Sequence, residues 1–191
     1  MIKTKSQLKQ IILQDCKAGG RTPRRISPFD TIGKFLVTMR RLDYYSYKKG
    51  KNPLLALPWL INKLKYRSLS LKLGYSIPCN VCGGGLALPH YGTIVINSGA
   101  KIGQNCRIQT CVNIGATYGA KSAPVIGNNV YIGPGAKIIG DVTVADGVCI
   151  GAGAVVNKSI TEPHTTWAGV PAKKISDNDS HIDLPIIPEN E

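Results

Sequence analysis

Aliphatic residues recur every six positions through the second half of the chain. A glycine often follows the aliphatic residue directly, and a small or β-branched residue often stands four positions after it. A period of six fits neither an α-helix, with 3.6 residues per turn, nor a simple strand, whose side chains alternate. Ten of the eleven members of the series are Ile or Val: Ile96, Ile102, Ile108, Ile114, Ala120, Ile126, Ile132, Ile138, Val144, Ile150 and Val156.

This period predicts short strands joined by tight turns, with three strands closing each coil of about 18 residues. An aliphatic side chain on each flat side points inward and stacks on its equivalent one coil later, so each coil is buried only against its neighbours. The glycines suit turns that need positive φ or a close backbone approach. We therefore predict a mainly β fold, a parallel β-helix, that begins near Ile77 and whose repeat ends near Val156–Thr161.

The exception in the series, Ala120, lies in the segment 117–124, which contains Gly and Pro but no repeat aliphatic. The six-residue phase is unbroken on both sides of it. We interpret the segment as a loop that leaves one corner of the coil. Loops on rigid scaffolds tend to carry function, and the alternative is a tolerated insertion.

The first 75 residues show helical periodicity instead. Apolar residues at helical spacing predict helices over 6–17, 31–47 and 53–73, with Pro58 either in the first turn of the third helix or breaking it. We divide the chain into a basic α-helical segment (1–75), a β-helix domain (76–174) and a flexible tail (175–191).

Charge separates these parts further. The net charge is +13, but residues 1–75 hold 17 of the 24 Lys and Arg and only three acidic residues, whereas 76–191 hold seven basic and eight acidic residues. A basic half indicates an anionic partner or a solvated basic face. Segment 53–73 combines Trp59, leucines and basic residues, so it either lies in a membrane interface or packs on the solenoid or a partner subunit.

Composition excludes several other classes. With 43% hydrophobic and 18% charged residues the chain can bury a core. It contains no run of the about 18 apolar residues that a membrane-spanning helix needs, and no secretory signal is visible at its start. We expect a cytoplasmic protein, at most peripheral to the inner membrane face. Its six cysteines should then be reduced, and because Cys79-x-x-Cys82 has no second ligand pair at suitable spacing, we expect no metal.

Three stretches resemble the hexapeptide-repeat acyltransferases: LPHYGTIVINSGAKIGQNCRI, VIGNNVYIGPGAKIIG and TTWAGVPAKKI. Within that superfamily the chain, over 31–175, resembles the serine acetyltransferase-like branch, and most of all the O-acetyltransferases of capsular and exopolysaccharide synthesis. The resemblance implies a left-handed β-helix, an exception to the usual right-handed crossover. It also implies a homotrimer that binds acetyl-CoA and an acceptor in clefts between neighbouring subunits.

His90 is the candidate catalytic residue, because it lies outside the repeat phase beside glycines and matches the family's catalytic histidine. His164 and His181 lie in the terminal turn and the tail. A neutral imidazole can take the proton from an acceptor hydroxyl as it attacks the acetyl-CoA thioester, which accelerates the reaction by roughly 10²–10⁴-fold. The chemistry requires no metal.

The resemblance also implies where acetyl-CoA binds. Backbone groups at solenoid turns would bind the pantetheine arm, and lysines would bind the phosphates. The matching positions are Ala116, Thr117, Pro134 and Ala152 for the turns, and Lys158 and Lys173 for the phosphates.

Departures from the serine acetyltransferase pattern bear on the acceptor. Pro89 and Tyr75 replace two aspartates, and 122–124 (Ser-Ala-Pro) replaces an Arg-His-Pro run. An amino-acid acceptor needs charged partners, so we expect a less charged acceptor, a glycan hydroxyl. A main-chain carbonyl or Tyr75 could then orient His90.

Other functions stay open beside this one. Within enzymes they are O-acetylation of L-serine and acetylation of a nucleotide-linked amino sugar. From another class, the chain could be a non-catalytic trimeric scaffold or a nucleic-acid-binding protein. We expect no nucleic acid, because the aromatic residues of the basic half alternate with helical apolar residues.

Overall fold

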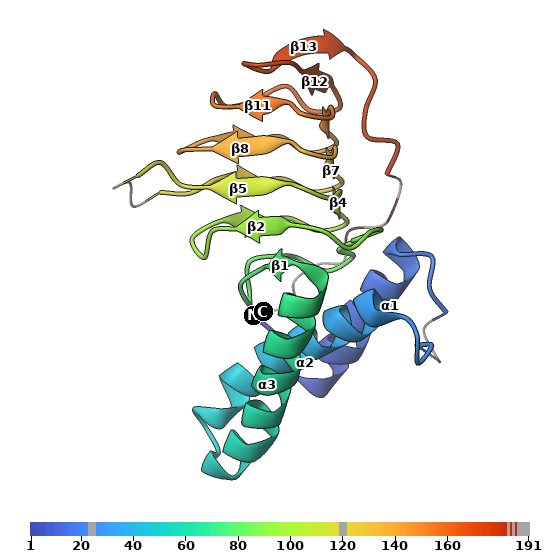
Figure 1. Ribbon diagram of the computed structural model, residues 1–191, viewed down its shortest axis with the longest axis vertical. Coiled ribbons are helices and arrows are strands. Elements are labelled where there is room, and N and C mark those ends of the chain that lie inside the picture. The colour runs from blue at the N-terminus through green and yellow to red at the C-terminus, as the bar shows by residue number, and fades with distance from the viewer. Residues whose placement is uncertain (23–25, 119–121, 183, 185, 187–191) are drawn as a thin grey trace.

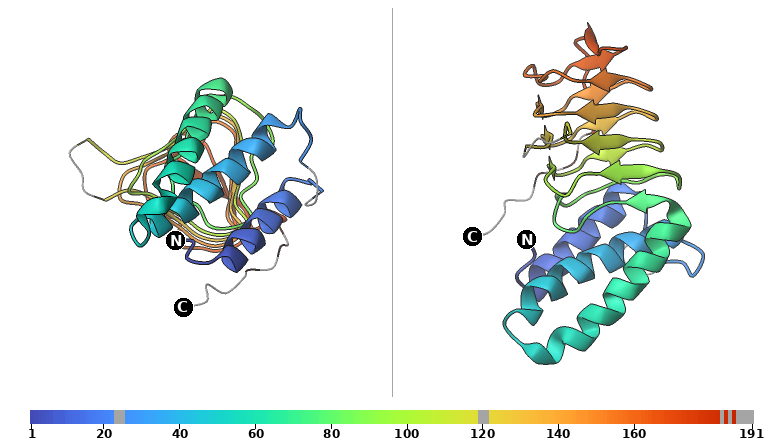
Figure 2. Two further views of the ribbon diagram at one scale, coloured as in Figure 1. Left: turned by 90° about the horizontal axis from the view of Figure 1, so that it is seen from below. Right: turned by 60° about the vertical axis from the view of Figure 1, so that its left-hand side comes forward.

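The protein is a column of stacked strands standing on a base of three helices (Figure 1). The computed structural model describes residues 1–22, 26–118, 122–182, 184 and 186. Seen from below, the helices lie across the end of the column (Figure 2). In this described part, no helix is long and apolar enough to span a bilayer.

The helical base follows from local signals in the sequence. Thr4 begins the first helix with a capping box, in which its hydroxyl accepts from the Gln7 backbone N–H. The Asp30 side chain accepts from the Gly33 N–H at the start of the second helix, and Gly74 ends the third with a φ of 76°. Pro58 lies in the first turn of the third helix, where its missing N–H costs nothing. The helices are α1 (Lys5–Ala18), α2 (Thr31–Lys49), the 3₁₀ turn η1 (Pro53–Leu55) and α3 (Ala56–Leu73).

Three sheets form the sides of the column, and all their internal pairings are parallel except one at the top. Sheet A runs β1 (Tyr75–Ser76), β2 (Ile94–Ile96), β5 (Asn113–Gly115), β8 (Lys137–Ile139) and β11 (Val155–Val156). Sheet B runs β3 (Lys101–Ile102), β6 (Val125–Ile126) and β9 (Thr143–Val144). Sheet C runs β4 (Arg107–Ile108), β7 (Tyr131–Ile132), β10 (Cys149–Ile150) and β12 (Thr166–Ala168), and β13 (Lys173–Ser176) pairs antiparallel with β12.

The predicted series lines the interior of the column. In sheet A, Ile96 pairs with Ile114, which pairs with Ile138, and all three are at most 3% exposed. The other two sheets stack their aliphatic residues in the same way. Burying a side chain of this size contributes about 1.5–3 kcal/mol, so the stack supplies most of the apolar core. The parallel, three-sided coil is thus confirmed.

Glycine is required where neighbouring coils approach most closely. A Cβ built on Gly103 would lie 2.5 Å from the Gly127 carbonyl oxygen, and one on Gly133 would lie 2.7 Å from the Ile150 carbonyl oxygen. Real Cβ atoms do not come so near to backbone atoms. The glycines that follow the repeat aliphatics therefore allow the coils to stack.

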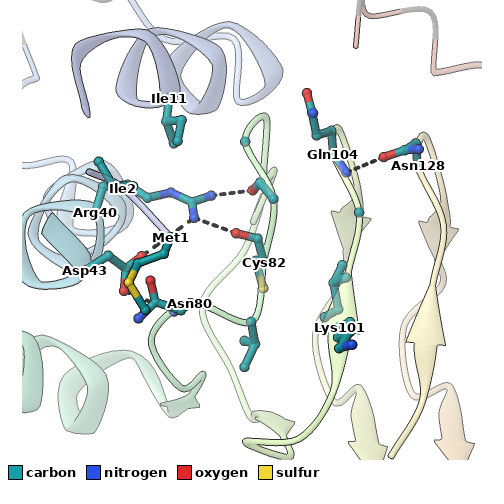
Figure 3. Close-up of a pocket in the computed structure, with 15 residues that line it drawn as sticks. Met1, Ile2, Ile11, Arg40, Asp43, Asn80, Cys82, Lys101, Gln104 and Asn128 are labelled. Carbon is teal, nitrogen blue, oxygen red and sulfur yellow. Dashed lines mark hydrogen bonds and ion pairs between the residues drawn. The ribbon is translucent and has the colours of Figure 1, made fainter. Parts of the chain in front are cut away.

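A buried arginine joins the base to the first coil (Figure 3). Arg40 of α2 is 2% exposed and pairs with Asp15 of α1 through Nε at 2.8 Å and Nη2 at 3.1 Å. Its guanidinium also donates to the carbonyls of Cys82 and Gly83 at 2.7 and 2.6 Å. Burial alone would lower the pKa of Arg40, but its pairing with Asp15 raises it above its usual value.

The same junction holds a second carboxylate. Asp43 lies 3.9 Å from the Arg40 guanidinium, and its Oδ1 accepts from the Asn80 N–H at 3.0 Å. Burial raises the pKa of Asp43, and Arg40 opposes that rise. Two helices and the first coil are therefore held together by one charged network.

Two segments differ from a simple reading of the repeat. The strands continue beyond Val156 to β13, so the column is taller than the six-residue series alone predicts. Beyond β13 the chain turns back along the column, where the Ser180 N–H donates to the Gly147 carbonyl at 3.0 Å. Of the expected corner loop 117–124, positions 119–121, including Ala120, lie outside the described residues. Figure 1 shows its flanks projecting from the end of β5.

Candidate active site

His90 lies in an enlarged corner of the first coil. The corner runs from Ala87 at sheet C to Val95 in sheet A. In the next coil, Ala87 bridges to Arg107 and Val95 pairs with Asn113. The chain takes eight residues from Ala87 to Val95 but six from Arg107 to Asn113. Two additional residues therefore push this corner outward, and His90 is exposed.

Tyr75 of β1 fixes the backbone of this corner. Its hydroxyl donates to the His90 carbonyl oxygen at 2.6 Å. The Tyr75 side chain is 3% exposed and packs edge-on against Phe35 of α2, with ring centroids 5.1 Å apart. Burial raises the pKa of Tyr75 to about 12, so the hydroxyl stays protonated and continues to donate.

The His90 imidazole itself forms no hydrogen bond to any part of the chain that the structure describes. Of the two orienting groups that the sequence suggested, Tyr75 is thus the one in contact, and it holds the main chain rather than the ring. The arrangement leaves an exposed imidazole with free nitrogens on a fixed backbone. Such a group can accept a proton from a bound hydroxyl.

Three of the predicted cofactor residues share an edge with His90. This edge, where sheet C turns into sheet A, is called here the His90 edge. The Gly135 N–H donates to the Thr110 carbonyl, and the Gly153 N–H donates to the Pro134 carbonyl, so the turns stack directly. Pro134 and Ala152 belong to these turns, and Lys173 lies above them where β13 pairs with Ala168.

The other three predicted cofactor residues lie on a different edge. Ala116 and Thr117 follow β5, and Lys158 follows β11, at the turn from sheet A to sheet B. The Gly140 N–H donates to the Gly115 carbonyl at 2.9 Å and stacks the turns of this edge, called here the Thr117 edge. The two edges lie at opposite ends of the sheet A strands. One copy of the chain therefore does not bring all six residues together.

Sequence reasoning missed two groups on the His90 edge. Cys111 follows Thr110 in the turn above His90, is exposed and has a φ of 60°. The Lys137 ammonium donates to the Cys111 carbonyl at 2.7 Å, which places a cation on this edge. Counting onward from His90 would have found Cys111 about one coil later and Lys137 about two coils later, because the turns of one edge are about one coil apart.

The remaining cysteines are buried thiols or lie away from this edge. Burial raises the pKa of Cys79, Cys82 and Cys106 to about 12, so these thiols stay protonated. Among the positions that the structure describes, no three His, Cys, Asp or Glu residues gather into a set that could bind a metal ion.

Comparison with known proteins identifies the repeat. Residues 123–158 match the family described as bacterial transferase hexapeptide (six repeats). The serine acetyltransferase of Escherichia coli (strain K12) is 36% identical over 157 residues, which cover 73% of this chain and 57% of that protein. The serine acetyltransferase of Buchnera aphidicola subsp. Acyrthosiphon pisum is 32% identical over 176 residues, which cover 86% of this chain and 61% of that protein. The chain thus spans about three fifths of the length of these curated relatives.

Solved structures show the same likeness. The serine acetyltransferase of Brucella abortus in complex with coenzyme A superposes with a TM-score of 0.67 at 26% identity, over 91% of this chain and 70% of that one. The serine acetyltransferase of Neisseria gonorrhoeae in complex with serine gives a TM-score of 0.61 at 26% identity, over 88% and 69%.

These relatives show that the expectation of a glycan or polysaccharide acceptor was wrong, because they are serine acetyltransferases. That expectation rested on charges missing at Pro89, Tyr75 and 122–124 of one chain. It took no account of charged groups that folding brings to the His90 edge from elsewhere, such as Lys137. The repeat and the stacked parallel sheets match the hexapeptide-repeat family, and over most of its length the chain is similar to serine acetyltransferases of the hexapeptide-repeat acyltransferase superfamily.

Proposed function

We propose that the protein is a serine O-acetyltransferase, which transfers the acetyl group of acetyl-CoA to the hydroxyl of L-serine. The observation that carries the proposal is the exposed His90 imidazole on a backbone held by Tyr75, in a chain whose relatives are serine acetyltransferases. Serine and coenzyme A are inferred from these relatives, and the corner of the first coil supplies His90 as a residue able to perform the chemistry.

His90 acts as the general base in this proposal. One imidazole nitrogen takes the proton of the serine hydroxyl while the hydroxyl oxygen attacks the thioester carbonyl carbon. The tetrahedral intermediate then collapses, the carbon–sulfur bond breaks, and the imidazolium returns the proton to the departing thiolate of CoA. General base catalysis of this kind contributes roughly 10²–10⁴-fold. Holding both reactants in one cleft supplies much of the remaining rate.

Acetyl-CoA binds along the solenoid edges in this proposal. The turns that contain Pro134 and Ala152 line the His90 edge for the pantetheine arm, and Lys173 offers a cation for the phosphates at the upper end of this edge. Lys137 supplies a cation for the serine carboxylate on the same edge.

A homotrimer would complete the site. Ala116, Thr117 and Lys158 lie on the Thr117 edge, at the far end of the sheet A strands from His90. Three left-handed coils placed side by side about a common axis can bring the Thr117 edge of one copy against the His90 edge of the next. Each cleft would then receive acetyl-CoA contacts from two subunits.

The test is acetyl transfer by the purified protein, followed as the loss of thioester absorbance with L-serine as acceptor. His90→Ala should lower kcat by roughly 10²–10⁴-fold. The control is His164→Ala, which removes an imidazole from the far turn, where it lies 3.6 Å from Asp179, and should leave kcat unchanged. Wild-type protein that releases no CoA with L-serine, or His90→Ala protein with full activity, would contradict the proposal.

A further inference from the structure

Helix α3 carries apolar residues on two opposite sides. Its inner side packs on α2 and the first coil through partly or fully buried residues, among them Tyr66, Leu69 and Leu73. Its outer side carries a second set at helical spacing, exposed by 44–76% of their surface: Leu57, Leu60, Ile61, Leu64 and Leu71. This set is called here the outer stripe. Because residues three, four and seven apart share one face of a helix, the stripe is continuous along α3.

Cations border the outer stripe on both sides. By helical position Lys63 and Arg67 flank one side of the stripe, and Lys65 and Lys72 flank the other. The chain has no acidic residue between Asp43 and Asp141. Asp43 is itself buried at the junction with Arg40, so it does not offset these charges at the surface.

The position of α3 leaves the stripe accessible. The helix lies at the base of the column, at the opposite end from β13 (Figures 1 and 2), and the side chains of the outer stripe are exposed. A large exposed apolar patch on a soluble domain marks an interaction surface. A helix with an apolar stripe between rows of Lys and Arg suits the boundary between lipid headgroups and acyl chains.

We propose that the outer stripe of α3 docks the protein on an anionic lipid bilayer. The leucines enter the acyl boundary, while the flanking lysines and Arg67 extend toward the headgroup phosphates. Docking at the base leaves both edges of the column open to solvent.

Charge favours a bilayer over a second copy of the chain on this surface. Two outer stripes facing each other would bring eight cationic side chains together with no carboxylate between them. An anionic surface instead pairs with every cation that borders the stripe.

The experiment is co-sedimentation of the full chain with vesicles of phosphatidylcholine alone or with phosphatidylglycerol, at low and high salt. We expect binding only to the anionic vesicles, weaker at high salt. The variant Leu57→Gln/Leu64→Gln/Leu71→Gln should bind at least tenfold more weakly. The control is Phe29→Gln, which removes a side chain that is 93% exposed outside α3 and should bind as the wild type does.

Other measurements separate the outcomes. If the triple variant fails to fold by circular dichroism, the single change Leu64→Gln tests the same stripe and should weaken binding severalfold. Wild-type protein that stays in solution with anionic vesicles at low salt would overturn the proposal. Unchanged vesicle binding by the folded triple variant would also overturn the proposal. The basic charges alone would then account for the binding, and the same charges would attract any polyanion, such as a nucleic acid. A triple variant with a smaller mass than the wild type by light scattering would overturn the proposal as well, because the stripe would then join copies of the chain.

Serine-dependent activity without vesicles should be the same in all variants, which keeps this test independent of the proposed function.

Discussion

The hydrogen bond from Tyr75 to His90 makes a sharp prediction about catalysis. Tyr75→Phe removes the hydroxyl that donates to the His90 carbonyl at 2.6 Å and leaves the ring packing against Phe35 intact. A neutral hydrogen bond of this kind contributes about 0.5–1.5 kcal/mol. If that free energy holds His90 where the transition state needs it, kcat falls by about two- to twelvefold, at 1.36 kcal/mol per factor of ten. Substrate KM values should change little, because Tyr75 is buried and presents almost no surface to a substrate.

Tyr66→Phe is the matched control. Tyr66 stacks on the same Phe35 ring at 5.4 Å, and its hydroxyl donates to the Ile77 carbonyl instead of to His90. Burial raises the pKa of Tyr66 to about 12, as it does for Tyr75. Both variants should lose similar free energy of unfolding in urea, and only Tyr75→Phe should lower kcat. Equal kcat values for the two variants, whether both lowered or both unchanged, would refute the positioning role.

Three further predictions concern the rest of the molecule. Arg40→Met leaves Asp15 buried without its partner and should lower the free energy of unfolding by about 3–5 kcal/mol in guanidinium titrations. A loss below about 1 kcal/mol would contradict the charged junction between the helices and the first coil. In the native protein the exposed Cys111 should react with a thiol reagent. Cys106 should react only after unfolding, because burial raises the pKa of its thiol to about 12. Labelling of Cys106 in the native protein, detected by mass spectrometry, would count against that burial. Gly103→Ala should lower the Tm by several degrees in calorimetry, because its Cβ would lie 2.5 Å from the Gly127 carbonyl oxygen, and an unchanged Tm would show that the coils can separate there.

The proposed acetyl transfer and the proposed membrane docking use different parts of the molecule. The proposed catalytic groups line the edges of the column, and the outer stripe lies on the helical base beneath it. The Arg40 network joins these two parts rigidly through Asp15 and the first-coil carbonyls. A protein docked through α3 would therefore hold its solenoid at a fixed distance from the surface.

The sequence by itself determined the solenoid. A six-residue period is a local property, and stacking equivalent aliphatic residues such as Ile114 and Ile138 is the one way to bury it in every coil. His90 became a candidate because it breaks this period beside matching motifs. Helix ends were equally local, since capping by Thr4 and Asp30 needs only residues within one turn.

Tertiary structure decided what depends on contacts between distant residues. It brought the Tyr75 hydroxyl to the His90 carbonyl, sorted the predicted cofactor residues onto two edges, and buried Arg40 between two helices and a coil. It also showed which side of α3 the core uses, whereas the sequence shows leucines on both sides. Hydrophobic periodicity records whether a position is suited to burial, but not which surface covers it, because the partner comes from another part of the chain.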